Sequence, residues 1–293
     1  MSPIKAVNSV PAAVGKPPQS NHPEPEAEPD FWSAEKYSSH FGSKPTSPER
    51  PLELVRPYLD KASTRLLDFG CGDGVVSLEL ADKVKSFTGI DGSTDMINAA
   101  RKRGLTDLRV LDGHFLQRHI YESNEAGVYD VVFSNLALHW MSRNPEIVVW
   151  GVHKALKPGG VFVAQFVGHM TGSETMLALS RAMEKRGYEK GKNWTTLYLP
   201  SSDEYKLLLE RCGFTVDVME NRVELMALPH GVDAWFETFV ESHLPMLSAK
   251  EKREVLEEVR EDLRPVCYRN GKWSVTANFI IFRAFKHLVA TPP

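Results

Sequence analysis

Short apolar runs alternate with helical patterns between residues 65 and 167, and this alternation limits the folds that the chain can adopt. Each run has the length of a buried strand, and the segments between the runs carry apolar residues at helical spacing. Parallel strands need crossover connections, which pack as helices on both faces of the sheet. The chain therefore predicts a doubly wound, mostly parallel α/β sheet. Its first five strands are expected at residues 65–69, 87–91, 108–111, 129–134 and 161–167.

The predicted helices have recognisable ends. Ser93 is an N-cap residue type and precedes the helix that follows the second strand. A helical pattern over residues 147–156 stops at the sequence KPGG, where proline followed by glycine is typical of a type II turn. Two further helices are expected at residues 51–59 and 75–84.

The two ends of the chain differ in composition from the rest. Residues 1–30 contain seven prolines among acidic and small residues, and such a stretch cannot offset its ordering entropy. We therefore expect a disordered tail over residues 1–30, a folded domain over 31–285 and a C-terminal tail over 286–293. Neither a secretory signal nor a mitochondrial presequence is recognisable after Met1, so the cytoplasm is the expected compartment.

The composition argues against several classes of partner. The formal net charge is −3 at pH 7, so no general attraction to nucleic acid or to an anionic membrane is expected. The longest apolar runs are far shorter than the roughly 20 residues of a membrane span. Three cysteines lie at wide, irregular spacing, which predicts free thiols and no metal site. A small molecule is the expected partner, and the oligomeric state is left open.

The first predicted strand runs into a glycine-rich turn, DFGCGDG at residues 68–74. In a doubly wound sheet, ligands bind at the carboxyl ends of the strands, and glycines let the backbone approach a ligand closely. Dinucleotide-binding enzymes use the spacing G-x-G-x-x-G. Counted from Gly70, the third glycine of that spacing falls on Val75, and Gly74 comes one residue early. The spacing therefore argues against a nicotinamide-dependent oxidoreductase.

Acidic residues end the next two predicted strands. Asp91 is the last residue of the second strand, and a carboxylate there can accept two charge-assisted hydrogen bonds from a ribose diol. Asp112 and Gly113 follow the third strand, where the carboxylate can accept from the exocyclic amine of adenine. Each position also has an ordinary interpretation, as a helix N-terminal acid or as an Asp-Gly turn. With the glycine loop beside them, a ribose and an adenine subsite are the preferred interpretation.

These motifs together resemble class I S-adenosylmethionine-dependent methyltransferases. The resemblance rests on LLDFGCGDG at residues 66–74, YDVVFSN at 129–135 and LKPGG at 156–160. It implies a methyltransferase enzyme that uses S-adenosylmethionine. The implied cofactor-binding residues are Asp68, Gly70, Cys71, Gly72, Gly74, Asp91, Asp112, Gly113 and Asn135.

The same resemblance implies a Rossmann-like methyltransferase fold with seven strands, the last hairpin of which is reversed. The final two strands would then lie at residues 214–219 and 279–285, and the cofactor-binding half would cover residues 52–168. Two inserts, at residues 170–200 and 229–273, would form helical lids over the substrate. The aromatic residues of these inserts fit a hydrophobic core as well as a pocket.

A narrower resemblance concerns the acceptor. The sequence SNLALHW at residues 134–140, with Trp32 and Tyr37 near the N-terminus, is similar to the trans-aconitate methyltransferase group and to malonyl-carrier-protein methyltransferases. Both groups methylate carboxylates, which implies O-methylation of a carboxylic acid such as a trans-aconitate-like polycarboxylate. The alternatives are N-, C- or hydroxyl O-methylation, or a protein that binds the cofactor without transferring methyl.

The sequence motifs identify no residue that has a definite catalytic role. His139 and Trp140 are the candidates near the reacting centre, because they closely follow the fourth strand. A carboxylate acceptor is already ionised at pH 7 and needs no general base. It does need donors that hold the acid, and arginine can grip a carboxylate with two hydrogen bonds. The expected substrate-binding residues are Tyr37, Trp194, Tyr198 and Arg264.

Overall fold

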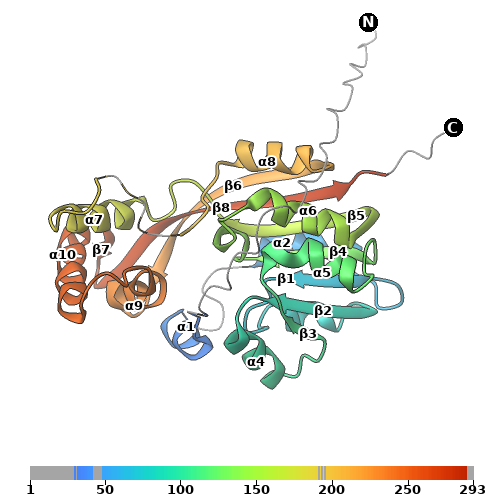
Figure 1. The fold of residues 1–293 in the computed structure, drawn as a ribbon, viewed down its shortest axis with the longest axis horizontal. Helices are drawn as coiled ribbons and strands as arrows, with labels where there is room; N and C mark the ends of the chain where they lie inside the picture. Colours follow the sequence, from blue (N-terminus) through green and yellow to red (C-terminus); the bar gives the residue numbers. More distant parts are fainter. Residues whose placement is uncertain are drawn as a thin grey trace, which may run out of the picture.

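Seven strands lie side by side in the order β3-β2-β1-β4-β5-β8-β6 in the computed structural model, which describes residues 30, 32–41, 48–190, 192, 194 and 196–288 (Figure 1). The first five strands run parallel, and β8 runs antiparallel to both of its neighbours. The strands are β1 (Arg65–Phe69), β2 (Ser86–Asp91), β3 (Leu108–Val110), β4 (Tyr129–Asn135), β5 (Leu156–Val167), β6 (Phe214–Leu228), β7 (Tyr268–Arg269) and β8 (Lys272–Lys286). The two-residue β7 pairs with β8 outside this order. The predicted mostly parallel sheet with a reversed final hairpin is confirmed.

Helices cover both faces of this sheet, as the alternation of strands and helices predicts. One face carries α2, α3 and α4, and the other carries α5, α6 and α8. The helices are α1 (Ala34–Phe41), α2 (Glu49–Val55), α3 (Ser77–Ala81), α4 (Thr94–Lys102), α5 (Leu116–Glu122), α6 (Pro145–Ala155), α7 (Ser173–Glu184), α8 (Ser202–Arg211), α9 (Gly231–Phe239) and α10 (Ala249–Cys267). Short 3-10 turns lie at η1 (Arg56–Tyr58), η2 (Gly113–Phe115), η3 (Leu138–Trp140) and η4 (Glu241–His243).

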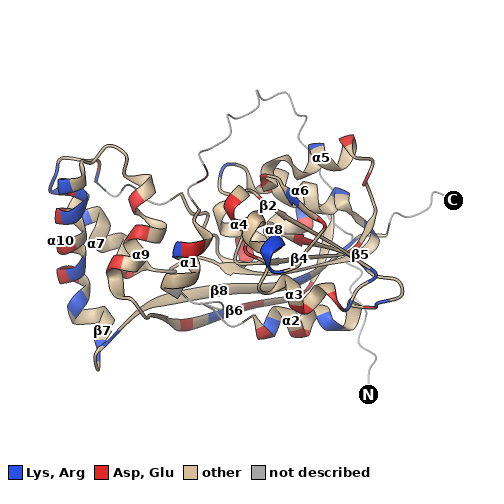
Figure 2. Cartoon of the chain, turned by 90° about the horizontal axis from the view of Figure 1, so that it is seen from below, with Lys and Arg blue, Asp and Glu red and all other residues tan. Residues whose placement is uncertain are grey.

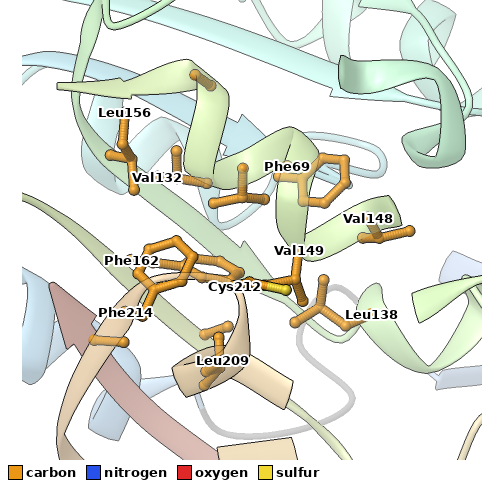
Figure 3. Packing of buried hydrophobic residues seen from close by; sticks show 14 of the residues in the cluster. Phe69, Val132, Leu138, Val148, Val149, Leu156, Phe162, Leu209, Cys212 and Phe214 are labelled. Carbon is orange, nitrogen blue, oxygen red and sulfur yellow. The ribbon is translucent and has the colours of Figure 1, made fainter. Parts of the chain in front are cut away.

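The main core lies between the sheet and helices α6 and α8 (Figure 3). Phe69, Phe162 and Phe214 project from three strands toward Val149 of α6 and Leu209 of α8, and each side chain is at most 1 % exposed. Burying a side chain of this size contributes about 1.5–3 kcal/mol relative to leaving it in water. Because Phe69 is the last residue of β1, this packing fixes the point at which the glycine-rich turn begins.

The hairpin formed by β6 and β8 is much longer than the predicted strands. Each of the two strands has 15 residues and extends beyond the rest of the sheet (Figure 1). Helices α7, α9 and α10 pack around this extension and share a second core, which we call the lid lobe. The predicted bounds at residues 214–219 and 279–285 were therefore wrong. The outer part of β6 is mostly exposed or half-buried, and the charged residues Arg222 and Glu224 interrupt its apolar residues, so the sequence did not mark it as a buried strand.

Three helices also differ from the expectation. α3 is only five residues long, shorter than the predicted 75–84, because the glycine turn continues to Val76. α5 and α8 were not predicted. α8 does carry a readable signal, a capping box in which Ser201 and Glu204 exchange side-chain and backbone hydrogen bonds.

The ends of the described chain are held by specific contacts. The Lys286 Nζ donates to the carbonyls of His153 and Leu156 at the end of α6, so this residue belongs to β8 and not to a tail. Of the predicted N-terminal tail, residue 30 is described, and residues 1–29 lie outside the described residues, as do residues 289–293. Over the described ranges, none of the helices has the length and apolar character needed to cross a membrane.

Candidate cofactor and acceptor site

The glycine-rich turn after β1 requires glycine at three positions. Gly70, Gly72 and Gly74 have φ of +78°, +55° and +81°, a region that L side chains rarely adopt. A Cβ at Gly70 would lie 2.2 Å from the Ala137 Cβ, and one at Gly74 would lie 2.6 Å from the Leu105 Cδ1. At Gly72 no atom lies within 4 Å of the same position. The backbone of Gly72 therefore borders open space that a ligand can approach.

The Asp91 carboxylate lies next to this turn, at the end of β2. One oxygen accepts from the Gly72 N–H at 2.9 Å, and the other accepts from the Ser93 N–H at 2.9 Å. A carboxylate offers about four acceptor positions, so two remain for the hydroxyls of a ribose. Burial raises the pKa of Asp91, and the described residues supply it with no ion pair. The pair Gly72 and Asp91 fits the ribose and the neighbouring chain of S-adenosylmethionine.

The side chains of Asp68 and Cys71 lie beneath the turn and not in the open space. Asp68 is 2 % exposed and accepts from the Ser77 hydroxyl at 2.6 Å. Burial raises the pKa of Asp68 to about 7, with the nearby Asp91 adding to the effect. The Cys71 thiol packs among the apolar residues around α4, and burial raises its pKa as well. Both residues support the turn from below.

Asp112, the predicted adenine acceptor, is held by neighbours from its own chain. Its carboxylate accepts from the His114 backbone N–H at 2.9 Å, contacts the His114 Nδ1 at 2.7 Å and forms an ion pair with Arg143. Burial alone would raise the pKa of Asp112, but the His114 hydrogen bonds and the Arg143 charge outweigh it and lower the pKa to about 2. This residue is therefore ionised throughout the physiological pH range.

The segment after β4 lies over the same region. A Cβ at Gly113 would lie 2.5 Å from the Met141 Sδ and 2.8 Å from the Phe69 Cζ, so a larger residue there would have to displace these side chains. Arg143, from the same segment, reaches Asp112. Sequence reasoning missed both Met141 and Arg143, because nothing local marks a contact between residues about 30 positions apart. Together they cover the predicted adenine side of the site.

Asn135 and His139 lie at the carboxyl end of β4. The Asn135 side-chain oxygen accepts from the Gln165 amide of β5 at 3.4 Å. His139 is only 6 % exposed, and burial lowers its pKa to about 3. Its buried Nδ1 has no hydrogen-bond partner among the described residues. The Tyr198 N–H donates to the His139 carbonyl at 2.8 Å, which brings one predicted substrate residue to the site.

Four aromatic rings from three separate segments meet beside His139. Trp32 lies at the centre, with ring centroids 4.8 Å from Trp140, 5.8 Å from Tyr37 and 6.3 Å from Phe239. Trp140 also stacks on Phe239 of α9 at 5.9 Å. Burial raises the pKa of Tyr37, and the charge of Asp73 in the glycine turn adds to this. We call these four residues the aromatic cluster.

The N-terminal segment that supplies Trp32 is fixed to the ribose side. The Asp30 carboxylate accepts from the Ser93 hydroxyl and from the Thr94 N–H, both at 2.9 Å. The Ala34 N–H donates to Asp95 at 2.8 Å, and Figure 2 shows α1 between α4 and α9. Sequence reasoning named Trp32 and Tyr37 but missed Asp30.

The structure does not bring Trp194 or Arg264 to this site. Trp194 is buried in the core of the lid lobe, where its ring meets Tyr188 at 5.4 Å. Arg264 is exposed on α10 and stacks on Tyr268 at 4.9 Å. Neither residue lies beside the glycine turn. Over the described residues, no group of three His, Cys, Asp or Glu side chains is arranged to hold a metal ion.

Comparison with known proteins agrees with this geometry. A family model for a methyltransferase domain matches residues 44–218. An uncharacterized methyltransferase of Schizosaccharomyces pombe is 34 % identical over 266 residues, which cover 88 % of this chain and 98 % of that protein. A trans-aconitate 2-methyltransferase of Deinococcus radiodurans is 30 % identical over 138 residues, 46 % of this chain and 48 % of that protein.

The fold has solved counterparts too. The YcgJ protein of Bacillus subtilis superposes with a TM-score of 0.52 at 16 % identity, over 82 % of this chain and 99 % of that one. The match to the trans-aconitate relative spans about half of its length, whereas the match to the yeast relative spans nearly all of it. The chain therefore belongs to the methyltransferase family and is an enzyme that uses S-adenosylmethionine as its methyl donor.

Proposed function

We propose that this enzyme methylates a carboxylate oxygen of a small organic acid. The observation that carries the proposal is the state of His139, whose ring centroid lies 5.3 Å from that of Trp140 in the aromatic cluster. With a pKa of about 3, its imidazole is neutral at pH 7 and a weak base. An acceptor that must first lose a proton is poorly served by such a group.

The free energy needed to remove that proton distinguishes the classes of acceptor. An alkylamine has a pKa near 10, so removing its proton at pH 7 costs about 4 kcal/mol without a base. A carboxylate has a pKa near 4 and is already a nucleophile at neutral pH. Asp112 offers no better base, because its pKa is about 2. The absence of a base among these residues therefore favours a carboxylate.

His139 also offers the acid a hydrogen bond. A buried polar atom without a partner costs about 1–3 kcal/mol, and a ligand that supplies the partner removes this cost. The Nδ1 of His139 is such an atom among the described residues. In the tautomer with the proton on Nδ1, it would donate to one acceptor carboxylate oxygen while the other oxygen is methylated.

The remaining residues supply orientation and a dry environment. When bound, S-adenosylmethionine supplies an electrophilic methyl group, and the protein must align the acceptor with it. Gly72 and Asp91 would hold the ribose side of the cofactor. The aromatic cluster would exclude water from the acceptor side, because rings from residues 32–37, η3 and α9 contact one another.

The names of two relatives support an acid as acceptor, whereas other relatives are ubiquinone biosynthesis O-methyltransferases. One similar protein carries the name trans-aconitate 2-methyltransferase, and a second with the same name, from Rhodopseudomonas palustris, is 36 % identical over 138 residues. Two arginines of the C-terminal region that could hold a second carboxylate already have acidic partners. Arg222 and Arg260 are paired with Glu224 and Asp233.

The test is the chemistry of the product. Purified enzyme is incubated with methyl-labelled S-adenosylmethionine and a metabolite extract, and the labelled products are identified by mass. A methyl ester is cleaved by mild alkali and releases labelled methanol, which is the expected result. A product that survives alkali would contradict the carboxylate acceptor and favour hydroxyl, N- or C-methylation. The Asp91→Ala variant serves as the control for labelling that does not depend on the cofactor site.

A further inference from the structure

The strand β6 has one unpaired edge. It is the outermost strand of the sheet, and among the described strands it pairs only with β8. Backbone N–H and C=O groups along such an edge form a template for a further strand. Neither proline nor glycine occurs anywhere in β6, so its outer part can accept a partner along the whole backbone.

One face of β6 is uncovered beyond Asn221. Up to that residue α8 covers the face, and the Asn221 amide donates to the Ser202 hydroxyl at 2.7 Å. Val223 and Leu225 follow on the same face, because side chains alternate along a strand, and they are 69 % and 76 % exposed. Single exposed apolar residues are ordinary. Two in succession on one face of an unpaired edge strand are typical of a contact surface.

The opposite face of the same stretch carries one charge of each sign. Arg222 and Glu224 form an ion pair at 2.7 Å, and their side chains are 50 % and 37 % exposed. Figure 2 shows charged residues of both signs along β6. In an antiparallel pair of identical strands related by a two-fold axis at Val223, each Arg222 lies opposite Glu224 of the second copy.

The charges also exclude the neighbouring registers. An axis at Glu224 would place two glutamates opposite each other, and an axis at Arg222 would place two arginines together. Like charges directly opposite are destabilising, whereas opposite charges stabilise the pair. With the axis at Val223, the two valines face each other and Leu225 faces Asn221 of the second copy.

We propose that two copies of this enzyme associate through antiparallel pairing of β6 with β6, on a two-fold axis at Val223. The contact is isologous, so it closes as a dimer and does not propagate. The partner is a second copy of this chain, because the charge pattern of the strand complements itself. The dimer would brace the hairpin that carries the lid lobe (Figure 1).

Cysteine cross-linking of the full chain tests the register directly. Residues facing each other across an antiparallel pair have Cα atoms about 4.5–5.5 Å apart, within the range that a disulfide spans. Val223→Cys should therefore form a covalent dimer under mild oxidation. Leu225→Cys is the matched control, since its two copies would lie about 13 Å apart. The native cysteines Cys71, Cys212 and Cys267 are buried, so the background is low.

A charge exchange tests the partner's identity. Glu224→Arg places arginine opposite arginine and should weaken the dimer several-fold in sedimentation equilibrium. The double variant Arg222→Glu with Glu224→Arg restores opposite pairs and should regain most of that loss. Wild-type enzyme that stays monomeric at hundreds of micromolar, or equal cross-linking of Val223→Cys and Leu225→Cys, would overturn the proposal. Both outcomes are independent of the acceptor.

Discussion

The two sides of the candidate site consist of different chemical groups. The proposed cofactor side consists of backbone amides and carboxylates at the ends of β1, β2 and β3, which the buried core fixes in place. The proposed acceptor side consists of aromatic rings from residues 32–37, η3 and α9, three segments far apart in the sequence. The first side is determined by local motifs, and the second depends on how the lid lobe and the N-terminal segment pack together. Substitutions should therefore separate the two sides.

The largest effect is expected on the cofactor side. Asp91→Ala removes a charged acceptor, and lost hydrogen bonds to a charged group cost about 1.5–3 kcal/mol. The affinity for S-adenosylmethionine should therefore fall about 10- to 150-fold in calorimetry. Asp82→Ala, at an exposed acid that follows α3, is the matched control and should bind normally. Equal affinity in Asp91→Ala and the wild type would remove the ribose assignment.

A smaller and differently placed loss is expected for Trp32→Ala. Aromatic pairs contribute about 0.5–1.5 kcal/mol beyond their buried area, and Trp32 contacts three rings. We expect kcat/KM for the acceptor to fall about tenfold while cofactor affinity stays close to that of the wild type. The control is Tyr121→Ala, which removes an exposed ring. An equal loss of affinity for S-adenosylmethionine in Trp32→Ala would contradict the separation into a cofactor side and an acceptor side.

Asp68, which lies beneath the glycine turn, should make the stability of the fold depend on pH. The pKa of Asp68 is raised to about 7 in the folded state, so the folded state binds the proton more tightly than the unfolded state. The stability from this carboxyl is present at pH 4 and is lost as the pH rises toward 7. Asp68→Asn carries no charge at this position. The Tm of this variant minus that of the wild type should therefore rise by several degrees between pH 4 and pH 8. A difference in Tm that stays constant with pH would contradict this assignment.

The smallest effect is expected at the N-terminus. A chain that begins at Asp30 keeps the carboxylate that binds Ser93 and Thr94, so its Tm and cofactor affinity should match those of the full chain. Asp30→Ala in the same background removes that acceptor, and loss of such a helix-capping contact costs about 0.5–2 kcal/mol. A drop of several degrees on shortening alone would show that residues before Asp30 stabilise the domain.

The success of sequence reasoning follows the same division. The bounds of β1 and the N-cap Ser93 were predicted correctly, because a buried apolar run and a cap are local features. The outer halves of β6 and β8 were missed, since these strands are only half-buried and charged or polar residues interrupt their apolar residues. The ion pair between Asp112 and Arg143 was missed because its partners are 31 residues apart.

The acceptor side shows the same limit. Tyr37 was placed near the substrate through a resemblance, and the structure brings it to the aromatic cluster. Trp194 has the same residue chemistry in the sequence, yet it lies in the core of the lid lobe. Tyr37 and Phe239 also pack against that core, so only the tertiary contacts with Trp32 and Trp140 place them in the aromatic cluster.

The short segment from His139 to Arg143 has a consequence for how such an enzyme changes over evolution. Within five residues it carries the ring that stacks on Phe239, the methionine over Gly113 and the arginine that holds Asp112. A mutation that inserts or deletes a residue here would shift both subsites at once and be selected against. Adaptation to a new acceptor is therefore expected to proceed through α1 and α9, whose rings can be exchanged one at a time while the donor subsite is inherited unchanged.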